Sequence, residues 1–263
     1  MSYLELRDIS KLYGEGAAEV HALQRVDLSV EAGSLVAIMG ASGSGKSTLL
    51  TIAGSLEDPS SGEVYIDGRP LASLSRNGKA QLRRQSIGYV FQDYNLVPAL
   101  TAAENVALPL ELDGMRAGRA RKLAESALEE VGLSGLGARF PDEMSGGQRQ
   151  RTAIARALIG DRRLVLADEP TGALDSQTSE AVLKVLRARC DAGAAGILVT
   201  HEPRYAGYAD RTVFLHDGRI VGSTGDPMPP VMPAGGYPDT YADSDEVADD
   251  ETLEASSGEE LTR

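Results

Sequence analysis

Residues 40–48 read Gly40-Ala41-Ser42-Gly43-Ser44-Gly45-Lys46-Ser47-Thr48, and this stretch decides the fold. It fits the pattern G-x-x-x-x-G-K-[ST], a loop whose backbone N–H groups surround phosphate oxygens. The apolar run 35–39 before it is suited to a buried parallel strand, and residues 46–53 after it are typical of a helix that begins directly from the loop. The order of strand, loop and helix predicts a phosphate-binding α/β domain.

The loop composition indicates how a nucleotide would be held. Gly40, Gly43 and Gly45 let the backbone turn its N–H groups inward, toward a helix N-terminus that also favours anions. Lys46 is expected to reach the β- and γ-phosphates, and the Ser47 hydroxyl is expected to bind Mg²⁺. The residues predicted to contact the phosphates are Gly40, Ser42, Gly43, Ser44, Gly45, Lys46, Ser47 and Thr48.

A second apolar run, residues 164–167, ends in the acidic pair Asp168-Glu169. Both acids are therefore expected at the carboxyl end of a central strand, beside the phosphate loop. Asp168 is suited to hold Mg²⁺, and Glu169 is suited to act as the general base that activates a water molecule. An acidic pair in this place can also serve only as a helix cap.

These motifs, together with Ser145-Gly146-Gly147-Gln148, resemble those of the ABC ATPases, and the resemblance covers residues 1–225. The run Asp168-Glu169-Pro170-Thr171 to Asp175 resembles the Walker B strand and D-loop of that family, which weakens the reading as a simple cap. The resemblance implies that residues 145–148 bind the γ-phosphate of a nucleotide held by another subunit. Small residues at the start of a helix suit this task, because its N–H groups face outward.

The resemblance assigns four further positions. Tyr13 matches the aromatic residue that stacks on adenine, and Val20 matches an apolar residue near the same ring. Gln92 matches the glutamine that touches Mg²⁺ and the attacking water, and His201 matches the histidine that contacts the γ-phosphate. His21, His216 and Cys190 belong to no motif and are expected to be surface, strand or helix-end residues.

The fold class that follows is α/β, a P-loop NTPase of the ABC ATPase type. It is expected to have a mixed or parallel core sheet, an antiparallel β subdomain and a helical signature subdomain at about residues 93–160. Strand-like runs at 64–66, 87–90 and 213–215 alternate with helical patterns at 119–131 and 176–189, as this architecture requires.

Composition narrows the setting of the protein. No apolar stretch approaches the roughly twenty residues that span a bilayer, and the N-terminus lacks the long apolar region of a signal peptide. A single cysteine suits a reducing compartment. Composition therefore indicates a soluble or peripheral protein of the cytosol, and the resemblance implies that it is peripheral on the inner face of the cell membrane. The formal charge of −13 argues against nucleic acid as the main ligand.

The charge is concentrated after residue 225. Residues 226–263 hold eleven Asp and Glu residues and one Arg, which leaves a formal charge of −3 on residues 1–225. Prolines open this segment and few large apolar residues follow, a composition typical of a disordered, solvating tail. A docking or autoinhibitory role is the alternative. The domains expected are thus an ABC ATPase domain at 1–225 and an acidic tail at 226–263.

The resemblance implies the ATP-hydrolysing subunit of a bacterial ABC transporter, working as a head-to-tail homodimer with an integral-membrane permease. Runs such as Tyr94-Asn95-Leu96 and Leu108-Pro109-Leu110 are similar to the macrolide-exporter and lipoprotein-releasing branch. The alternative is a regulatory ATPase that gates a cell-wall hydrolase or sensor complex. A soluble ABC protein of ribosome or DNA-repair type would show tandem cassettes or a long coiled coil, and the sequence has neither.

Overall fold

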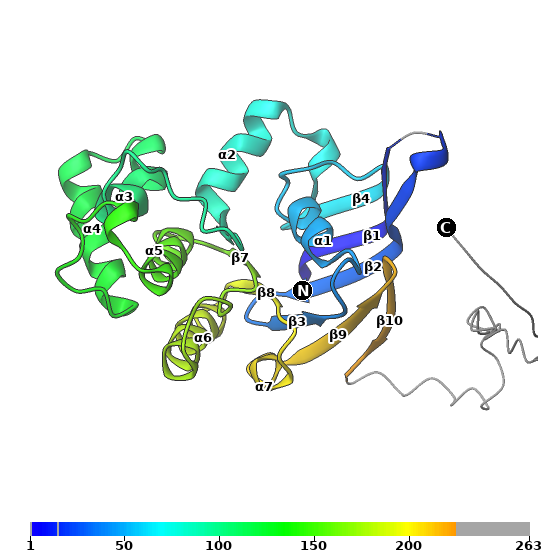
Figure 1. Ribbon diagram of the computed structural model, residues 1–263. Coiled ribbons are helices and arrows are strands. Elements are labelled where there is room, and N and C mark those ends of the chain that lie inside the picture. Colours follow the sequence, from blue (N-terminus) through cyan, green and yellow to red (C-terminus); the bar gives the residue numbers. More distant parts are fainter. Residues whose placement is uncertain (1, 15, 225–263) are drawn as a thin grey trace, which may run out of the picture. The chain divides into compact units, whose positions relative to one another are not determined.

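The computed structural model describes residues 2–14 and 16–224 of the chain. The acidic segment 226–263, and with it the expected domain boundary before that segment, lies outside the described residues. Within the described residues the chain forms two β-sheets and three groups of helices around them (Figure 1). In this part of the chain, no helix has both the length and the apolar character needed to cross a membrane.

The larger sheet carries the phosphate loop. Its strands lie in the order β10 (Arg219–Ser223), β9 (Arg211–His216), β3 (Leu35–Met39), β8 (Ala195–Val199), β7 (Leu164–Asp168) and β6 (Ile87–Val90). All neighbours in it are parallel except β9 and β10. Strands β3, β7 and β8 are buried along almost their whole length and, apart from Asp168 at the end of β7, carry no charged residue, because other elements cover both faces of the sheet.

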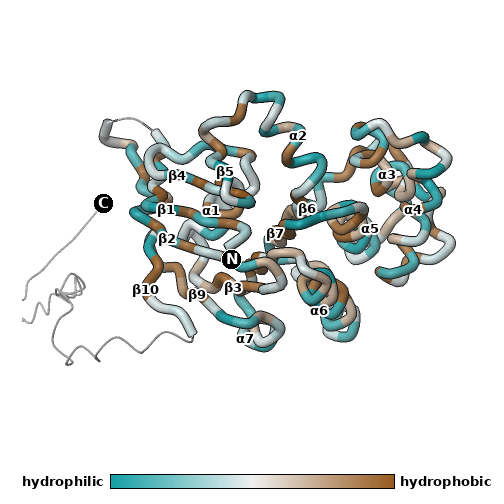
Figure 2. Tube along the Cα trace, turned by 180° about the vertical axis from the view of Figure 1, so that it is seen from behind, coloured by the Kyte–Doolittle hydropathy of each residue, from teal (hydrophilic) through white to brown (hydrophobic). Residues whose placement is uncertain are grey.

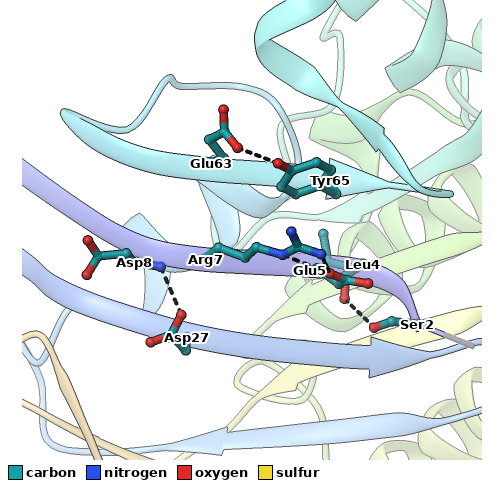
Figure 3. A network of polar contacts seen from close by, with 8 residues as sticks. All are labelled: Ser2, Leu4, Glu5, Arg7, Asp8, Asp27, Glu63 and Tyr65. Carbon is teal, nitrogen blue, oxygen red and sulfur yellow. Dashed lines mark hydrogen bonds and ion pairs between the residues drawn. The ribbon is translucent and has the colours of Figure 1, made fainter.

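The smaller sheet is antiparallel, with the order β2 (Val20–Glu31), β1 (Ser2–Tyr13), β4 (Ser61–Ile66) and β5 (Arg69–Pro70). Its outer face is polar, as Figure 3 shows: the Arg7 guanidinium lies 4.3 Å from the centre of the Tyr65 ring and binds the Glu5 carboxylate. Strand β1 is irregular between Leu6 and Ile9, and Asp8 there has a φ of 51°. The Asp8 N–H that this irregularity frees donates to the Asp27 carboxylate at 2.9 Å.

Helix α1 (Lys46–Ala53) joins the two sheets. Its side chains Leu49, Leu50 and Ile52 are fully buried in one apolar cluster with residues of β1, β2, β3, β7 and β8. Burial of each such side chain stabilises the fold by about 1.5–3 kcal/mol. Because α1 begins at Lys46, this packing also fixes the phosphate loop.

The remaining helices cover the other face of the larger sheet or extend from it. A second apolar cluster contains residues of α3 (Ala102–Leu112), α4 (Ala117–Glu130), α5 (Gly146–Leu158) and α6 (Ser176–Asp191). Figure 1 shows α3 and α4 at the end of the molecule away from β1 and β4, within the range 93–160 expected for the helical subdomain. The short elements are η1 (Gly16–Ala18), η2 (Leu71–Ser73), η3 (Pro141–Glu143) and α7 (Pro203–Ala206).

Helix α2 (Arg76–Ser86) differs from the others because none of its residues is buried. Figure 2 shows this contrast, with a largely hydrophilic α2 and an apolar β3. Ser75 caps the helix, since its side chain accepts a hydrogen bond from the Gly78 N–H. The Ser75 cap and the partly buried Leu82, which packs against the apolar cluster around α1, therefore support α2.

Asp210, directly before β9, links strand β3 to helix α6. Its Oδ2 accepts hydrogen bonds from the Leu35 N–H and from Arg187 of α6, both at 2.7 Å. Burial acts to raise the pKa of Asp210, but these two donors outweigh it and hold that pKa below its usual range. Ionised Asp210 therefore stabilises the start of β3.

We expect Asp210→Asn to lower the free energy of unfolding at pH 7 by up to about 1 kcal/mol, a modest value because solvent screens this half-exposed carboxylate. A carboxyl group whose pKa is depressed by folding contributes stability above its unfolded pKa of about 3.9, and this contribution disappears as the pH falls through the folded value. The difference from the native chain should therefore shrink in acid. Urea titrations at pH 7 and pH 3 measure this, with exposed Asp142→Asn as control; a loss independent of pH would contradict it.

Candidate active site

Four loops that carry polar side chains meet at one edge of the larger sheet. Strands β3, β6, β7 and β8 are parallel neighbours or near neighbours, so their carboxyl ends lie on the same side. The loops after them border a cavity of about 700 Å³. The predicted site residues that line it are Val20, Gly40, Ser42, Gly43, Gly45, Lys46, Ser47, Thr48, Gln92, Asp168, Glu169 and His201.

Two glycines let the phosphate loop pack against neighbouring backbone. A Cβ at Gly45 would lie 2.3 Å from the Ala22 carbonyl oxygen, and Gly45 also has a φ of 101°. A Cβ at Gly40 would lie 2.2 Å from the Leu215 carbonyl oxygen. Any larger residue would push the loop away from β2 or β9. Gly43, in contrast, has a φ of 79° and open space around it, so its role is conformational.

Lys46 and Ser44 fit a phosphate group. The Lys46 ammonium is 8% exposed and donates to the carbonyl oxygens of Gly40 and Ala41, at 2.9 and 2.7 Å. One of its three donors is left for a ligand. The Ser44 hydroxyl is buried and, among the described residues, has no hydrogen-bond partner. A buried polar atom without a partner is unfavourable. Ser44 is nevertheless not among the residues that line the cavity, although it was predicted to contact the phosphates.

Asp168 and Ser47 fit a magnesium ion. Burial raises the pKa of Asp168, whereas a hydrogen bond from the Ser47 hydroxyl opposes that rise. A hydroxyl and a carboxylate in contact at a phosphate site are the ligands that Mg²⁺ takes together with phosphate oxygens. The described residues contain no cluster of three or more His, Cys, Asp or Glu side chains that could hold a metal ion.

Glu169 and His201 lie side by side at the ends of neighbouring strands. The Glu169 Oε1 is 3.3 Å from the His201 Nδ1, and both side chains are accessible from the cavity. Glu169 has a φ of 46°, an unusual conformation for a residue other than glycine, and its N–H donates to the Val199 carbonyl oxygen at 3.1 Å. This bond to the adjacent strand β8 holds the carboxylate beside the imidazole. Strain at such a position is typical of functional sites.

Tyr13 and Val20 form the open side of the site. They are direct partners in the β1–β2 pairing, and Val20 is 60% exposed and lines the cavity. The Tyr13 hydroxyl donates to the Glu57 carboxylate at 2.6 Å, and Glu57 is also paired with Lys11. The Lys11 ammonium also lies 5.2 Å from the centre of the Tyr13 ring, and Tyr13 is 39% exposed. Tyr13 itself is not among the residues that line the cavity.

The other predicted residues lie outside the cavity, as expected for groups that act on a second subunit's nucleotide. Ser145 caps α5: its hydroxyl accepts from the Gln148 N–H at 3.2 Å, and the Gln148 side chain accepts from the Ser145 N–H at 3.0 Å. Asp175 caps α6 through the Thr178 N–H and hydroxyl. A helix cap was an expected alternative role for Asp168-Glu169. The helix that follows this pair, α6, is capped by Asp175 instead.

Sequence reasoning missed part of the cavity wall. His21, Ala22 and Gln24 of β2 and Asp217 of the β9–β10 turn also line it, although His21 was expected to have no part in the site. The hairpin turn Asp217-Gly218 has positive φ at both residues, and the Gly218 N–H donates to the Ser44 carbonyl oxygen at 3.0 Å. The Asp-Gly pair between two strand-like runs is a hairpin signal that predicts the turn, but not its position against the loop.

Comparisons with known proteins agree with this geometry. A family profile described as ABC transporter matches residues 23–172. The chain belongs to the ABC transporter family. It is 47% identical over 218 residues to the lipoprotein-releasing system ATP-binding protein LolD of Bordetella pertussis, covering 82% of this chain and 94% of that protein. It is 45% identical over 226 residues to the macrolide export ATP-binding/permease protein MacB of Marinobacter nauticus.

The MacB match covers 86% of this chain but only 35% of that protein, so the chain spans about a third of the length of such relatives. Both matches confirm the predicted resemblance to the macrolide-exporter and lipoprotein-releasing branch. Among solved structures, the dimeric bacterial ABC transporter cassette MJ0796 matches with a TM-score of 0.80 and 41% identity, over 84% of this chain and 97% of that one. The predicted ABC ATPase fold is therefore confirmed.

Proposed function

We propose that the chain is the ATP-hydrolysing subunit of a bacterial ABC transporter and works as a head-to-tail dimer that drives a separate permease. The observation that carries this proposal is the convergence of Lys46, Ser47, Asp168, Glu169 and His201 on one cavity at the carboxyl edge of the parallel sheet. A post-hydrolysis structure of the MJ0796 cassette, bound to ADP and Pi, has the same fold with a TM-score of 0.80.

Each residue has a defined task in hydrolysis. The loop N–H groups and Lys46 bind the phosphates and stabilise charge that develops on the transferred group. Glu169 accepts a proton from the attacking water. The hydrogen bond from the Glu169 N–H to the Val199 carbonyl oxygen of β8 holds the residue in place for this step. His201, 3.3 Å from Glu169, orients that carboxylate and contacts the γ-phosphate.

Ser47, Asp168 and Gln92 would hold Mg²⁺. When bound, the ion would neutralise charge on the phosphates. Burial of Asp168 limits how many water molecules can compete for its carboxylate. Gln92 is exposed at the end of β6, so its amide can reach either the ion or the water without rearrangement of the strand.

The proposal of a dimer rests on predicted phosphate-binding residues that lie outside the cavity of their own chain. Ser145, Gly146 and Gly147 present the N-terminus of α5 at the surface, outside the cavity that holds the phosphates of their own chain. In a head-to-tail dimer they would bind the γ-phosphate of the partner subunit's ATP, with Asp175 in the interface between them. Two identical composite sites result, and ATP closes both.

The permease would dock in a groove of about 410 Å³ on the other side of β6. Tyr89, Phe91 and Leu108 give it an apolar floor, and arginines of α2 and α5 border it. The segment 88–95 connects this groove directly to Gln92 in the ATP cavity. A relative named an ATP-binding/permease protein is matched over 35% of its length. Bound to its permease, the protein would be peripheral on the cytoplasmic face of the membrane.

The first test concerns Glu169. If it is the general base, Glu169→Gln should retain MgATP while kcat falls by roughly 10²–10⁴, because the amide cannot accept the proton. The variant should accumulate as an ATP-dependent dimer in gel filtration. Glu130→Gln, which removes a surface carboxylate paired with Arg189, is the control. Turnover by Glu169→Gln near the native rate would assign the base to another residue.

A second test separates the two halves of the composite site. Lys46→Ala removes a charge-assisted phosphate contact and should weaken ATP binding to the single chain, whereas Ser145→Arg should leave that binding intact and block closure. A mixture of the two variants should regain activity, up to one working site per dimer. Ser75→Arg controls for the lost helix cap, because Ser75 also caps its helix through its side chain. Normal hydrolysis by Ser145→Arg would exclude the composite site.

A third test concerns the base. Stacking on an aromatic ring contributes about 1–3 kcal/mol and tolerates different bases, so Tyr13→Ala should weaken ATP and GTP binding alike. Tyr13→Phe loses the hydrogen bond to Glu57 but keeps the ring, and Lys11 still neutralises Glu57, so its affinity should be nearly unchanged. Calorimetric titration with each nucleotide measures both. A large loss with Phe would assign the contact to the hydroxyl.

A further inference from the structure

Two consecutive residues after Gln92 have an unusual backbone. Tyr94 has a φ of 60° and Asn95 a φ of 50°, and neither is a glycine. The turn is tight, because the Asn95 N–H lies 2.6 Å from the Asp93 carbonyl oxygen. Left-handed residues of this kind are unfavourable unless surrounding groups hold them. Some feature of the structure must therefore fix this segment.

Arg156 of α5 supplies that hold. One guanidinium nitrogen donates to the Tyr94 carbonyl oxygen at 2.8 Å, and the other donates to the Asn95 carbonyl oxygen at 2.5 Å. The planar fork of arginine matches two successive carbonyl groups, which a lysine cannot do with the same geometry. Burial lowers the pKa of Arg156, and both printed hydrogen bonds of its guanidinium go to carbonyl oxygens among the described residues. Its hydrogen bonds are directed at the backbone alone.

The side chain of Tyr94 makes a second connection to the same helix. A Cβ at Gly146 would lie 3.3 Å from the Tyr94 hydroxyl oxygen, and the Arg149 guanidinium lies 5.5 Å from the centre of the Tyr94 ring. Tyr94 thus contacts the first turn of α5 with its side chain, while Arg156 near the end of α5 binds its carbonyl. The first turn is the Ser145–Gly147 segment that would bind the partner subunit's nucleotide.

We propose that Arg156 is a positioning residue that binds the 92–95 segment to α5, so that Gln92 and the Ser145–Gly147 segment move as one body. This inference rests on the proposed function, because Gln92 acts on the nucleotide of its own chain and Ser145 on that of the partner. The tether makes the two nucleotide sites of a dimer sense one another: displacement of Gln92 in one site displaces the γ-phosphate contact in the other. Arg156 also lines the groove proposed for the permease. A permease bound there would therefore contact the residue that links the 92–95 segment to the Ser145–Gly147 segment.

The matched comparison is between two arginines of α5. Arg151, like Arg156, donates to backbone carbonyl oxygens, but to those of Val131, Gly132 and, at 3.4 Å, Gly147, and not to the 92–95 segment. In the full chain without nucleotide, Arg156→Met should speed amide hydrogen exchange at residues 94–96 by about tenfold or more, the factor expected for a lost charge-assisted hydrogen bond. Arg151→Met should leave exchange at 94–96 unchanged. Arg156→Lys, which keeps the charge but not the fork, should lie between the two.

Kinetics then tests the link to Gln92. Arg156→Met should lower kcat about 10- to 100-fold with little change in KM for ATP, because a displaced group affects reaction geometry more than binding. In a Gln92→Ala background the same substitution should have no further effect on kcat, since it acts through Gln92. Additive losses in that cycle, or unchanged exchange at 94–96 in Arg156→Met, would overturn the inference.

The two proposals fail separately. If the native chain does not hydrolyse MgATP, the proposed function is wrong, yet the exchange measurement still shows whether Arg156 holds the segment. If the native chain hydrolyses MgATP and Arg156→Met matches it in both exchange and kcat, the function stands and the tether is wrong. Should Arg156→Met not fold, Arg156→Lys gives the same two readouts, and native values for both would reject the tether.

Discussion

Contact between two backbones governs the arrangement of the active site. Gly45 lies against the Ala22 carbonyl of β2, where a Cβ would be 2.3 Å from the oxygen, and the Gly218 N–H donates to Ser44 on the same loop. The phosphate loop is thereby fixed to the antiparallel sheet and to the β9–β10 turn. Strand β1 pairs with β2, so the same contact sets where Tyr13 stands relative to the phosphates. A single side-chain methyl at residue 45 would disturb all of these relations.

Local patterns predicted the elements well. Strand β3 and helix α1 begin and end where the apolar run and the loop indicate, and the capping residues Ser145 and Asp175 mark the starts of α5 and α6. These features depend on neighbours in sequence. The placement of four loops at one edge also followed, because parallel strands with acidic or polar carboxyl ends allow few other arrangements. The residue roles taken from the family resemblance remain predictions for the experiments above.

What the sequence did not predict depends on contacts between distant segments. Ala22 and Asp217 reach the cavity only because β2 and a hairpin almost two hundred residues later pack on the same loop. The left-handed backbone of Glu169 has no local signal, since glutamate rarely adopts it and the hydrogen bond that stabilises it comes from β8. No local pattern in the sequence likewise distinguishes Arg156 from the other arginines of the helices. Its partners, sixty-one and sixty-two residues away, appear only in the fold.

Several residues in and beside the site have surroundings or backbone conformations that are unfavourable for their residue type. Asp168 is buried, Ser44 has no hydrogen-bond partner among the described residues, and Glu169, Tyr94 and Asn95 have left-handed backbones. Each of these is unfavourable in the isolated chain, and a bound cation would relieve the first. The left-handed backbones are held by neighbouring strands and helices instead. Ligand binding therefore stabilises the phosphate side of the cavity, whereas the 92–95 side depends on α5. Movement of α5 can change the 92–95 side while the phosphate side stays folded.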